Sequence, residues 1–491
     1  MPPLIIQGGM GIGISGWQLA GAVGRAGGLG VVSGVALDVL LARRLQDGDS
    51  DGHLREALSR FPVPEIASRV LSRYFRRGGR ARDEPYRPVP RLTLQPSIER
   101  QQLAVVAAFA EVDLARRAAG GNRVGINFLE KIQLATPAAA LGAILAGVDT
   151  VLVGAGIPTR IPSLLDTLSR QRCAELPIDV AGAGAGNARH ALALDPVQLL
   201  GRRLPALARP RCFAVISSTT LATFLARDEA TRPDGFVVEA SIAGGHNAPP
   251  RGRLQVDAHG EPVYGPRDAA DLTEIAALGL PYWLAGGYGR SEGLATALAA
   301  GASGIQVGTA FALARESGLA PPLRQLLLDG LDGPGLDGPG LDVRTDVRAS
   351  PTGFPFKVVQ MAGTLSDPDV YGRRRRVCDL GLLRSPYARA DGTVGYRCPA
   401  EPADSYVRKG GDRSHTVGRV CLCNGLTATA SLAQCAHDGT LEQPIVTLGT
   451  DLAGARELRL RHPDGWGAAD VVAYLTGAPV PPPPQRDPLP A

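Results

Sequence analysis

The chain has 491 residues, 44% of them hydrophobic, so it can bury a large core. A formal net charge of +5 is modest for this length and argues against a protein that mainly binds nucleic acid. The densest basic cluster, Arg373–Arg376, has few aromatic neighbours to stack bases, and we interpret it as a solvated or ion-paired surface. Lysine occurs only at Lys131, Lys357 and Lys409, a skew that we attribute to base composition.

The sequence also argues against a membrane protein. The longest apolar runs have the length of strands or are broken by glycine. The first residues lack the positive region and apolar segment of a signal peptide. Seven cysteines, an odd number, fit a reducing compartment. We therefore expect a soluble, cytoplasmic protein.

Short apolar runs alternate with helical segments rich in alanine and leucine over residues 1–327. Eight such runs occur, at 4–8, 29–33, 124–128, 151–154, 212–217, 236–240, 282–285 and 304–307. Eight βα units in succession predict an α/β protein with a (β/α)8 barrel. A ninth run, 178–181, is assigned to an excursion after the fourth strand, and a doubly wound sheet is the alternative.

Two stretches interrupt this pattern. Residues 36–100 form a long helical insertion after the second strand, a position from which insertions often act as lids. Residues 328–342 repeat a Leu-Asp-Gly-Pro-Gly motif and predict a flexible linker. A cysteine-rich extension at 343–476 is expected to pack on the barrel, and the Pro-rich tail 477–491 is predicted to be disordered.

The strand expected at 236–240 leads into Gly244, Gly245 and His246. The glycines let the backbone turn sharply and let a flat ligand come close. His246 then lies at the carboxyl end of a strand, where it can exchange a proton near neutral pH. Glu239, in the same region, could accept a hydrogen bond from a ligand hydroxyl.

Two later strands also end in glycine turns, at 284–289 and 304–309. Backbone N–H groups in such turns favour a phosphate, and barrels commonly bind phosphate at their last two strands. The alternative is a pair of tight turns without a ligand. The first strand ends in Gln7-Gly8-Gly9-Met10, and the third carries Asn127, whose amide suits the edge of a heteroaromatic ring or, alternatively, caps a loop.

The ordered set QGGM, GIN, AGGH, AGGYG and QVGT resembles the nitronate monooxygenase family, formerly 2-nitropropane dioxygenases. This family includes FMN-type enoyl-acyl-carrier-protein reductases and the enoyl reductases of polyketide and fatty acid synthases. The resemblance covers about residues 3–318 and 350–357, and implies FMN bound in a TIM barrel. His246 matches the proposed catalytic base. The expected cofactor-binding residues are Gln7, Gly9, Met10, Asn127, Glu239, Gly244, Gly245, Gly286, Gly287, Gln306, Val307, Gly308 and Thr309.

The resemblance implies a small-molecule substrate and an oxidoreductase that oxidises alkyl nitronates or nitroalkanes with O2, with His246 as the base. The chain departs from the family pattern at Ile242, in the loop 247–252, and at Glu239, where monooxygenases tend to have Gln. These departures keep open an FMN- and NAD(P)H-dependent enoyl-thioester reductase that works with a fatty acid or polyketide synthase. A third hypothesis is a non-catalytic barrel that binds a phosphorylated ligand. The oligomeric state is open, with a homodimer as one option.

The extension also raises the question of a metal. Four cysteines, with Cys435 and His437 behind them, could bind zinc as thiolates: Cys378, Cys398, Cys421 and Cys423. Their spacing fits no common zinc signature, and no CxxC pair occurs. We therefore expect buried free cysteines that pack as small hydrophobic residues.

Overall fold

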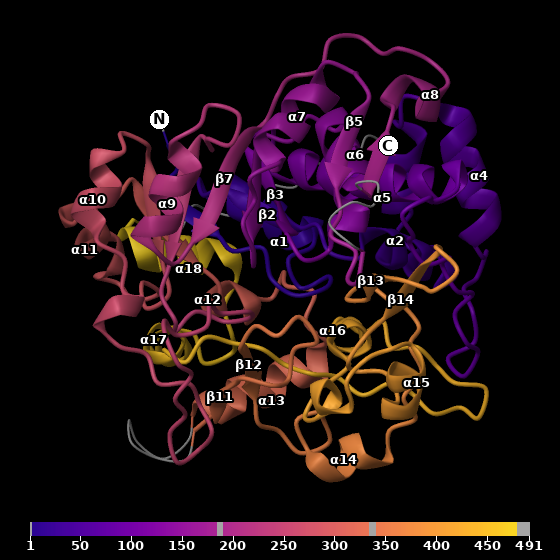
Figure 1. Cartoon of the computed structure of the whole chain (residues 1–491). Coiled ribbons are helices and arrows are strands. Elements are labelled where there is room, and N and C mark those ends of the chain that lie inside the picture. Colours follow the sequence, from indigo (N-terminus) through magenta and orange to yellow (C-terminus); the bar gives the residue numbers. More distant parts are fainter. Residues whose placement is uncertain (1, 184–189, 333–339, 479–491) are drawn as a thin grey trace.

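The computed structural model describes residues 2–183, 190–332 and 340–478 (Figure 1). Eight parallel strands form one sheet in the order β1-β10-β9-β8-β7-β4-β3-β2. Their bounds are β1 (Ile5–Gln7), β2 (Gly30–Ser33), β3 (Val124–Leu129), β4 (Thr150–Gly154), β7 (Arg211–Ile216), β8 (Gly235–Glu239), β9 (Tyr282–Ala285) and β10 (Gly304–Val307). A parallel bridge between Ile6 and Leu29 joins the two ends of the sheet. The predicted (β/α)8 barrel is confirmed.

Helices follow the strands and cover the barrel from outside. They are α1 (Trp17–Arg25), α5 (Ile98–Ala118), α6 (Thr136–Leu145), α7 (Ile161–Ser169), α9 (Thr219–Ala226), α10 (Leu272–Ala277), α11 (Gly293–Ala299), α12 (Thr309–Ala312) and α13 (Pro321–Leu331). Side-chain caps start several of them; the Ser97 hydroxyl, for example, accepts the N–H of Arg100 at 3.2 Å. None of the helices within the described ranges is both long and apolar enough to cross a bilayer.

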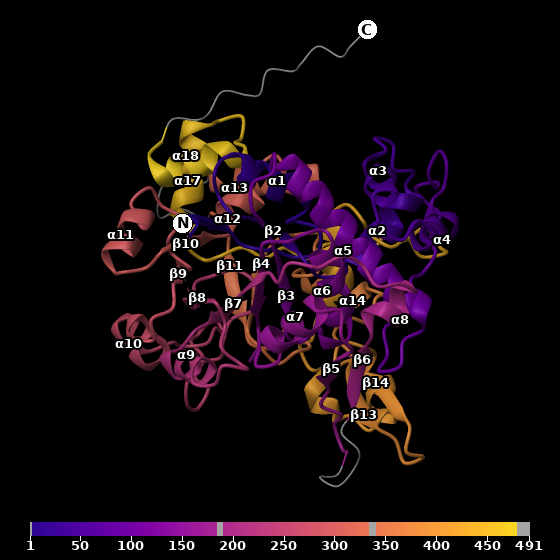
Figure 2. The ribbon, with the colours of Figure 1, turned by 90° about the horizontal axis from the view of Figure 1, so that it is seen from above.

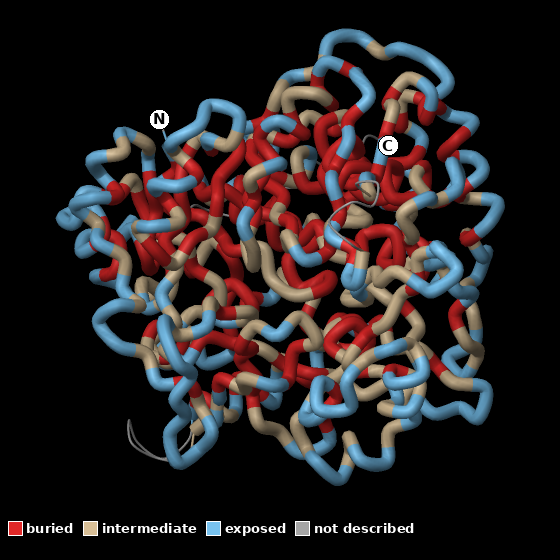
Figure 3. The backbone as a smooth tube through the Cα atoms, in the orientation of Figure 1, coloured by how far each residue is buried: buried red, intermediate tan, exposed pale blue. Residues whose placement is uncertain are grey.

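The inside of the barrel is filled by large side chains. Phe213 and Trp283 stack there with ring centroids 4.6 Å apart, and the Trp283 indole donates to the carbonyl of Pro3 at 2.7 Å. Burial is concentrated in the barrel, whereas the connecting loops are exposed (Figure 3). This packed interior provides a rigid base for residues at the strand ends.

The insertion after β2 forms α2 (Leu37–Gln46), α3 (His53–Ser59) and α4 (Pro64–Tyr74), which join the hydrophobic cluster around α5 and α6. The excursion after β4 forms β5 (Ala174–Pro177), β6 (Ala191–Leu194) and α8 (Pro196–Leu200), outside the barrel sheet. The run at 178–181 is not itself a strand. The residues just before it, Ala174–Pro177, form β5 and pair with β6. Within that run, only Ala181 forms a bridge, to Tyr387.

The extension packs against one side of the barrel (Figures 1 and 2). Its strands are β11 (Val343–Asp346), β12 (Phe356–Val359), β13 (Ser385–Ala388) and β14 (Val394–Arg397). Its helices are α14 (Pro368–Arg373), α15 (Ala403–Arg408), α16 (Leu422–Thr429), α17 (Ala453–Arg461) and α18 (Ala468–Thr476). Within the basic cluster, Arg374 forms a salt bridge of 2.5 Å with Glu442, and Arg376 lies over the ring of Tyr371.

The first residues of the predicted linker belong to a helix. Helix α13 continues to Leu331, because Leu328 and Leu331 are buried and extend its apolar face. Residues 328–331 are therefore helical, and 343–346 form β11. The central part of the predicted linker, 333–339, and the predicted tail from 479 onward lie outside the described residues.

Candidate functional site

A cavity of about 260 Å³ opens at the carboxyl ends of the barrel strands. It gathers all but one of the residues predicted for the site, although they come from five different strands and their loops. These residues are Gly9, Met10, Asn127, Glu239, Gly244, Gly245, His246, Gly286, Gly287, Gln306, Val307, Gly308 and Thr309.

Gln7 is the predicted site residue that the structure does not bring to the cavity. It is fully buried, and its amide oxygen accepts the N–H of Val31 at 3.0 Å. Its amide nitrogen donates to Ser15 at 2.8 Å. The side chain therefore holds β1 against its neighbours, because β1 ends with Gln7 pointing into the protein.

Asn127 lies in the cavity wall against the glycines that follow β1. A Cβ atom at Gly9 would lie only 2.1 Å from its Oδ1, so no larger residue than glycine fits there. That oxygen is buried and has no hydrogen-bond partner within the protein. An unpaired buried acceptor is costly, which makes it a place for a donor group on a ligand.

The turn after β9 closes another part of the wall. Gly286 and Gly287 have φ angles of +81° and +83°, a region that residues with a side chain rarely adopt. A Cβ at Gly287 would also lie 2.8 Å from the Ile242 side chain. The chain can therefore pass close to the cavity here with its backbone groups accessible.

Glu239 ends β8 and lines the cavity. Burial raises its pKa to about 7, and the charge of Lys357 opposes this rise. The carboxyl group thus changes its charge near neutral pH. It can accept hydrogen bonds when ionised and donate one when protonated.

His246 lies beyond the glycines, in contact with the extension. Its ring meets Phe356 edge-on at 4.8 Å, and its Nε2 lies 2.7 Å from the hydroxyl of Ser350. Burial lowers the pKa of His246 to about 4, so the ring is neutral at pH 7. If Ser350 donates to Nε2, the proton of the ring is on Nδ1.

The extension supplies part of the site that the motif analysis missed. The Thr447 hydroxyl accepts the N–H of Gly245 at 2.9 Å, and Thr309 accepts the N–H of Gly449 at 3.0 Å. The apolar run followed by Thr-Leu-Gly at 445–449 could have indicated a further strand end with a turn. Ser350 and Phe356 fall in the segment that carried the family resemblance.

The insertion contributes no residue to the cavity wall, which is completed by 426 and 447–455 instead. Helices α2 to α4 pack on the outer side, around α5. A lid role for residues 36–100 therefore gains no support from the lining of the cavity.

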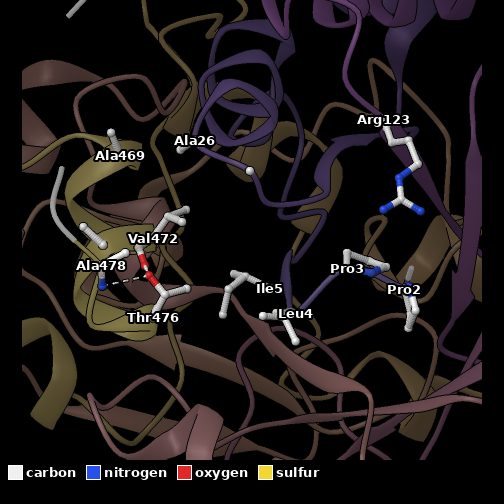
Figure 4. A pocket seen from close by; sticks show the side chains of 12 residues that line it. Pro2, Pro3, Leu4, Ile5, Ala26, Arg123, Ala469, Val472, Thr476 and Ala478 are labelled. Carbon is white, nitrogen blue, oxygen red and sulfur yellow. Dashed lines mark hydrogen bonds between the residues drawn. The ribbon is translucent and has the colours of Figure 1, made fainter. Parts of the chain in front are cut away.

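A second cavity, of about 450 Å³, lies where the barrel strands begin (Figure 4). It lies between the residues before β1, the end of α1 and helix α18. Its polar side chains are those of Arg123 and Thr476, and its lining contains no His, Cys, Asp or Glu. It therefore lacks the proton-transferring groups of the first cavity.

All seven cysteines are free thiols. Cys398 and Cys423 are buried, and the four candidate ligands interact electrostatically with one another. Within the described ranges, no group of three or more His, Cys, Asp or Glu side chains is arranged to hold a metal ion.

Residues 203–332 match the family model described as nitronate monooxygenase. This range contains β7 to β10, and hence Glu239, His246 and both later glycine turns. The match confirms the resemblance found in the sequence. The matched residues make up about a quarter of the chain, and the match indicates an oxidoreductase.

A curated relative is 32% identical over 142 residues: the (3aS,4S,5R,7aS)-5-hydroxy-7a-methyl-1-oxo-octahydro-1H-indene-4-carboxyl-CoA dehydrogenase of Mycobacterium tuberculosis (strain ATCC 25618 / H37Rv). The alignment covers 29% of this chain and 36% of the relative, so the chain spans about a third of the relative's length.

Two solved structures are similar over most of the chain. The nitroalkane oxidase of Streptomyces ansochromogenes is 16% identical, with 88% of this chain and 96% of that chain covered and a TM-score of 0.41. The enoyl reductase domain of MlnA from the macrolactin biosynthesis cluster of Bacillus amyloliquefaciens is 12% identical, with 97% and 94% covered and a TM-score of 0.45. At these TM-scores, the two comparisons support no conclusion beyond the eight-stranded barrel already described.

Proposed function

We propose that the chain is an FMN-dependent oxidoreductase that oxidises alkyl nitronates. The observation that carries the proposal is the buried Oδ1 of Asn127, which has no partner within the protein and lies in the cavity wall. A flavin ring has an N–H group at its edge that such an acceptor suits. The match of residues 203–332 to the nitronate monooxygenase model supports the same cofactor.

The remaining residues of the cavity fit the other parts of FMN. The backbone N–H groups of the turns after β9 and β10 suit its phosphate, because glycine turns present several donors to one anion. Glu239 suits a hydroxyl of the ribityl chain. Gly9 leaves room for the Asn127 side chain in the wall, because a Cβ at Gly9 would lie 2.1 Å from its Oδ1.

The surroundings of His246 favour a substrate that arrives as an anion. Bound FMN would supply the oxidant for a carbanion-like substrate. His246 is neutral at pH 7, because burial lowers its pKa to about 4, and it is therefore a weak base. A nitronate is already deprotonated and needs a hydrogen-bonding partner more than a base. The extension forms the wall on this side of the cavity, because Phe356 and Thr447 line it.

A second candidate is an enoyl-thioester reductase that uses NAD(P)H. Two observations favour it: Glu239 stands where monooxygenases tend to have Gln, and the curated relative is named for action on a CoA thioester. In that reaction His246 would hold or protonate the substrate rather than deprotonate it.

An anaerobic bleaching experiment tests these proposals. The purified protein should show flavin absorption or take up added FMN. A colourless protein that refuses FMN would contradict both enzymes and favour a non-catalytic binder of a phosphorylated ligand. Bleaching by propyl nitronate alone supports nitronate oxidation, whereas bleaching by NADH or NADPH supports the reductase.

A further inference from the structure

We propose that Asn247 is a positioning residue that holds a water molecule behind Glu239, and that this water donates a hydrogen bond to the Glu239 carboxylate. The consequence for the cofactor rests on the proposed function, because Glu239 is one of the expected FMN contacts. The water and its effect on Glu239 can be tested without any cofactor.

A small cavity of about 30 Å³ lies on the other side of Glu239 from the main one. Part of its wall comes from the loop 247–252, where the chain departs from the family pattern. Of the described residues, only Glu239 lines both cavities. A space of this size holds one or two water molecules, so the polar groups in its wall share the same one or two molecules.

Asn247 provides an acceptor in the wall of the small cavity. The residue is only 2% exposed, and its backbone N–H donates to the carbonyl of Pro355 at 2.9 Å. Its Nδ2 donates to the carbonyl of Ala243 at 3.0 Å. Because a carbonyl can only accept, this bond fixes which end of the amide is the NH2 group, and Oδ1 faces away from Ala243. That oxygen is buried without a partner among the described residues, so it requires a donor.

Glu239 presents the second acceptor. Burial raises its pKa to about 7, and the charge of Lys357 opposes this rise. No hydrogen bond from the described part of the chain contributes to this pKa. A water that donates one hydrogen to Asn247 and the other to Glu239 satisfies both side chains. Because a bond to the carboxylate favours its ionised form, the water acts in the same direction as Lys357.

The hydroxyl groups of the wall complete the surroundings of a water. Ser217 and Ser241 line the small cavity, and their hydroxyls can donate to the water oxygen. Tyr264 donates its hydroxyl hydrogen to the carbonyl of Ala248 at 2.9 Å. Burial raises the pKa of Tyr264 to about 12, so it stays neutral and can only accept a further bond. The cavity thus offers both donors and acceptors, as a water requires.

The charged groups of the wall do not favour an ion in place of water. Asp268 and Arg251 line the small cavity besides Glu239. The carboxylate of Asp268 accepts the backbone N–H groups of Arg251 and Gly265, each at 2.7 Å, so both of its oxygens have partners. With charges of both signs in the wall, a neutral molecule that donates and accepts is the ligand that fits.

A crystal structure of the protein as purified tests the water itself. We expect a water oxygen at about 2.7–3.2 Å from Oδ1 of Asn247 and within the same reach of the Glu239 carboxyl group. An empty cavity, or a water that reaches only one of the two side chains, would overturn the proposal.

Two variants provide a matched comparison. Asn247→Leu replaces the amide by methyl groups and should lose the water. Asn424→Leu is the control, because Asn424 is also buried with an unpaired Oδ1 but lines neither cavity. The control variant should keep the water.

The effect on Glu239 is measured through the pH dependence of stability. Because the pKa of Glu239 is raised on folding, the stability of Glu239→Gln relative to the wild type should increase with pH and level off near the folded pKa. In an Asn247→Leu background the levelling should occur about one pH unit higher, because the carboxylate has lost a donor. In an Asn424→Leu background it should occur where it does in the wild type. Urea unfolding from about pH 5 to 9 covers this range.

The levelling pH separates the proposal from a structural role of Asn247. A loss of stability in Asn247→Leu that is equal at every pH, with the levelling pH unchanged, would overturn the proposal. If Asn247→Leu does not fold, the water position in the wild-type crystal structure decides. Neither measurement uses FMN, so a protein that shows both effects and binds no FMN would contradict only the proposed function.

Discussion

The hydroxyl of Ser350 lies 2.7 Å from Nε2 of His246, although 104 positions separate the two residues in the chain. Ser350 is fully buried, and its oxygen also accepts the N–H of Thr352 at 3.2 Å. The orientation of the candidate catalytic histidine is therefore fixed by the extension, not by the barrel that carries it. The two parts of the chain form one site.

Replacement of His246 tests its role directly. We expect His246→Ala to retain FMN, because the residue lies beyond the glycine turns proposed for the cofactor, and to reduce turnover by about 10²-fold or more. Flavin absorbance gives the stoichiometry, and oxygen uptake with a nitronate gives the rate. His259→Ala, at an exposed position, is the matched control. Unchanged turnover would remove His246 from the mechanism.

Ser350→Ala should act through His246. The ring loses its fixed partner, so we expect turnover to fall by about tenfold while FMN is retained. The buried imidazole nitrogen is left unpaired, and the free energy of unfolding should decrease by about 1–3 kcal/mol. Steady-state kinetics and urea unfolding measure the two effects, with Ser50→Ala on the surface as control. A lower free energy of unfolding with unaltered kinetics would limit Ser350 to a structural role.

The barrel could be predicted because each of its strands is recognisable from a few consecutive residues. Each strand is a short apolar run, and β1, β2, β9 and β10 are followed directly by glycine. Such a run can be found in the sequence without knowing which strands lie beside it. Parallel strands share one carboxyl edge, so residues as distant as Gly9 and Gly308 could be placed at one site. The end of α13 was missed because the buried Leu331 looks like part of a repeat in the sequence.

The contribution of the extension could not be predicted in the same way. The hydrogen bond from Gly245 to Thr447 joins residues 202 positions apart, and no local pattern encodes such a pairing. Lys357 also looked like one of a few scattered lysines, because its burial is a property of the fold. Gln7 was expected at the cofactor site because it adjoins a glycine motif. Its side chain instead points into the core and accepts the N–H of Val31.

The two shifted groups of the cavity should give opposite pH dependences of stability. The pKa of His246 falls from 6.5 to about 4 on folding, so its contribution is present above pH 6.5 and is lost as pH falls toward 4. The pKa of Glu239 rises from 4.5 to about 7, so its contribution is present below pH 4.5 and is lost as pH rises through 7. Between pH 4.5 and 6.5 the two effects, each on the order of 3 kcal/mol, oppose each other.

Single replacements should separate these effects. Relative to the wild type, Glu239→Gln should become more stable as pH rises from 4.5 to 6.5, and His246→Ala should become less stable. Urea unfolding across this range measures both differences, and referring each variant to the wild type at the same pH cancels the other titrating groups. Differences that do not change with pH would show that neither group is shifted on folding.

Two adjacent glycines allow a matched test of the cofactor site. A Cβ at Gly9 would lie 2.1 Å from Oδ1 of Asn127, so Gly9→Ala must displace the amide that we propose to meet the flavin ring. At Gly8 the nearest atom to such a Cβ is 3.6 Å away, an ordinary contact. We expect Gly9→Ala to lose FMN affinity by about tenfold or more and Gly8→Ala to bind nearly as the wild type does.

Equilibrium dialysis with FMN measures the affinities, and a cooperative thermal transition confirms that both variants fold. The two substitutions add the same methyl group to neighbouring residues that both line the cavity, so only the position of Asn127 distinguishes them. Wild-type affinity in Gly9→Ala would show that Asn127 does not contact the cofactor. Equal losses would show that the segment after β1 tolerates no methyl group, whatever the position of Asn127.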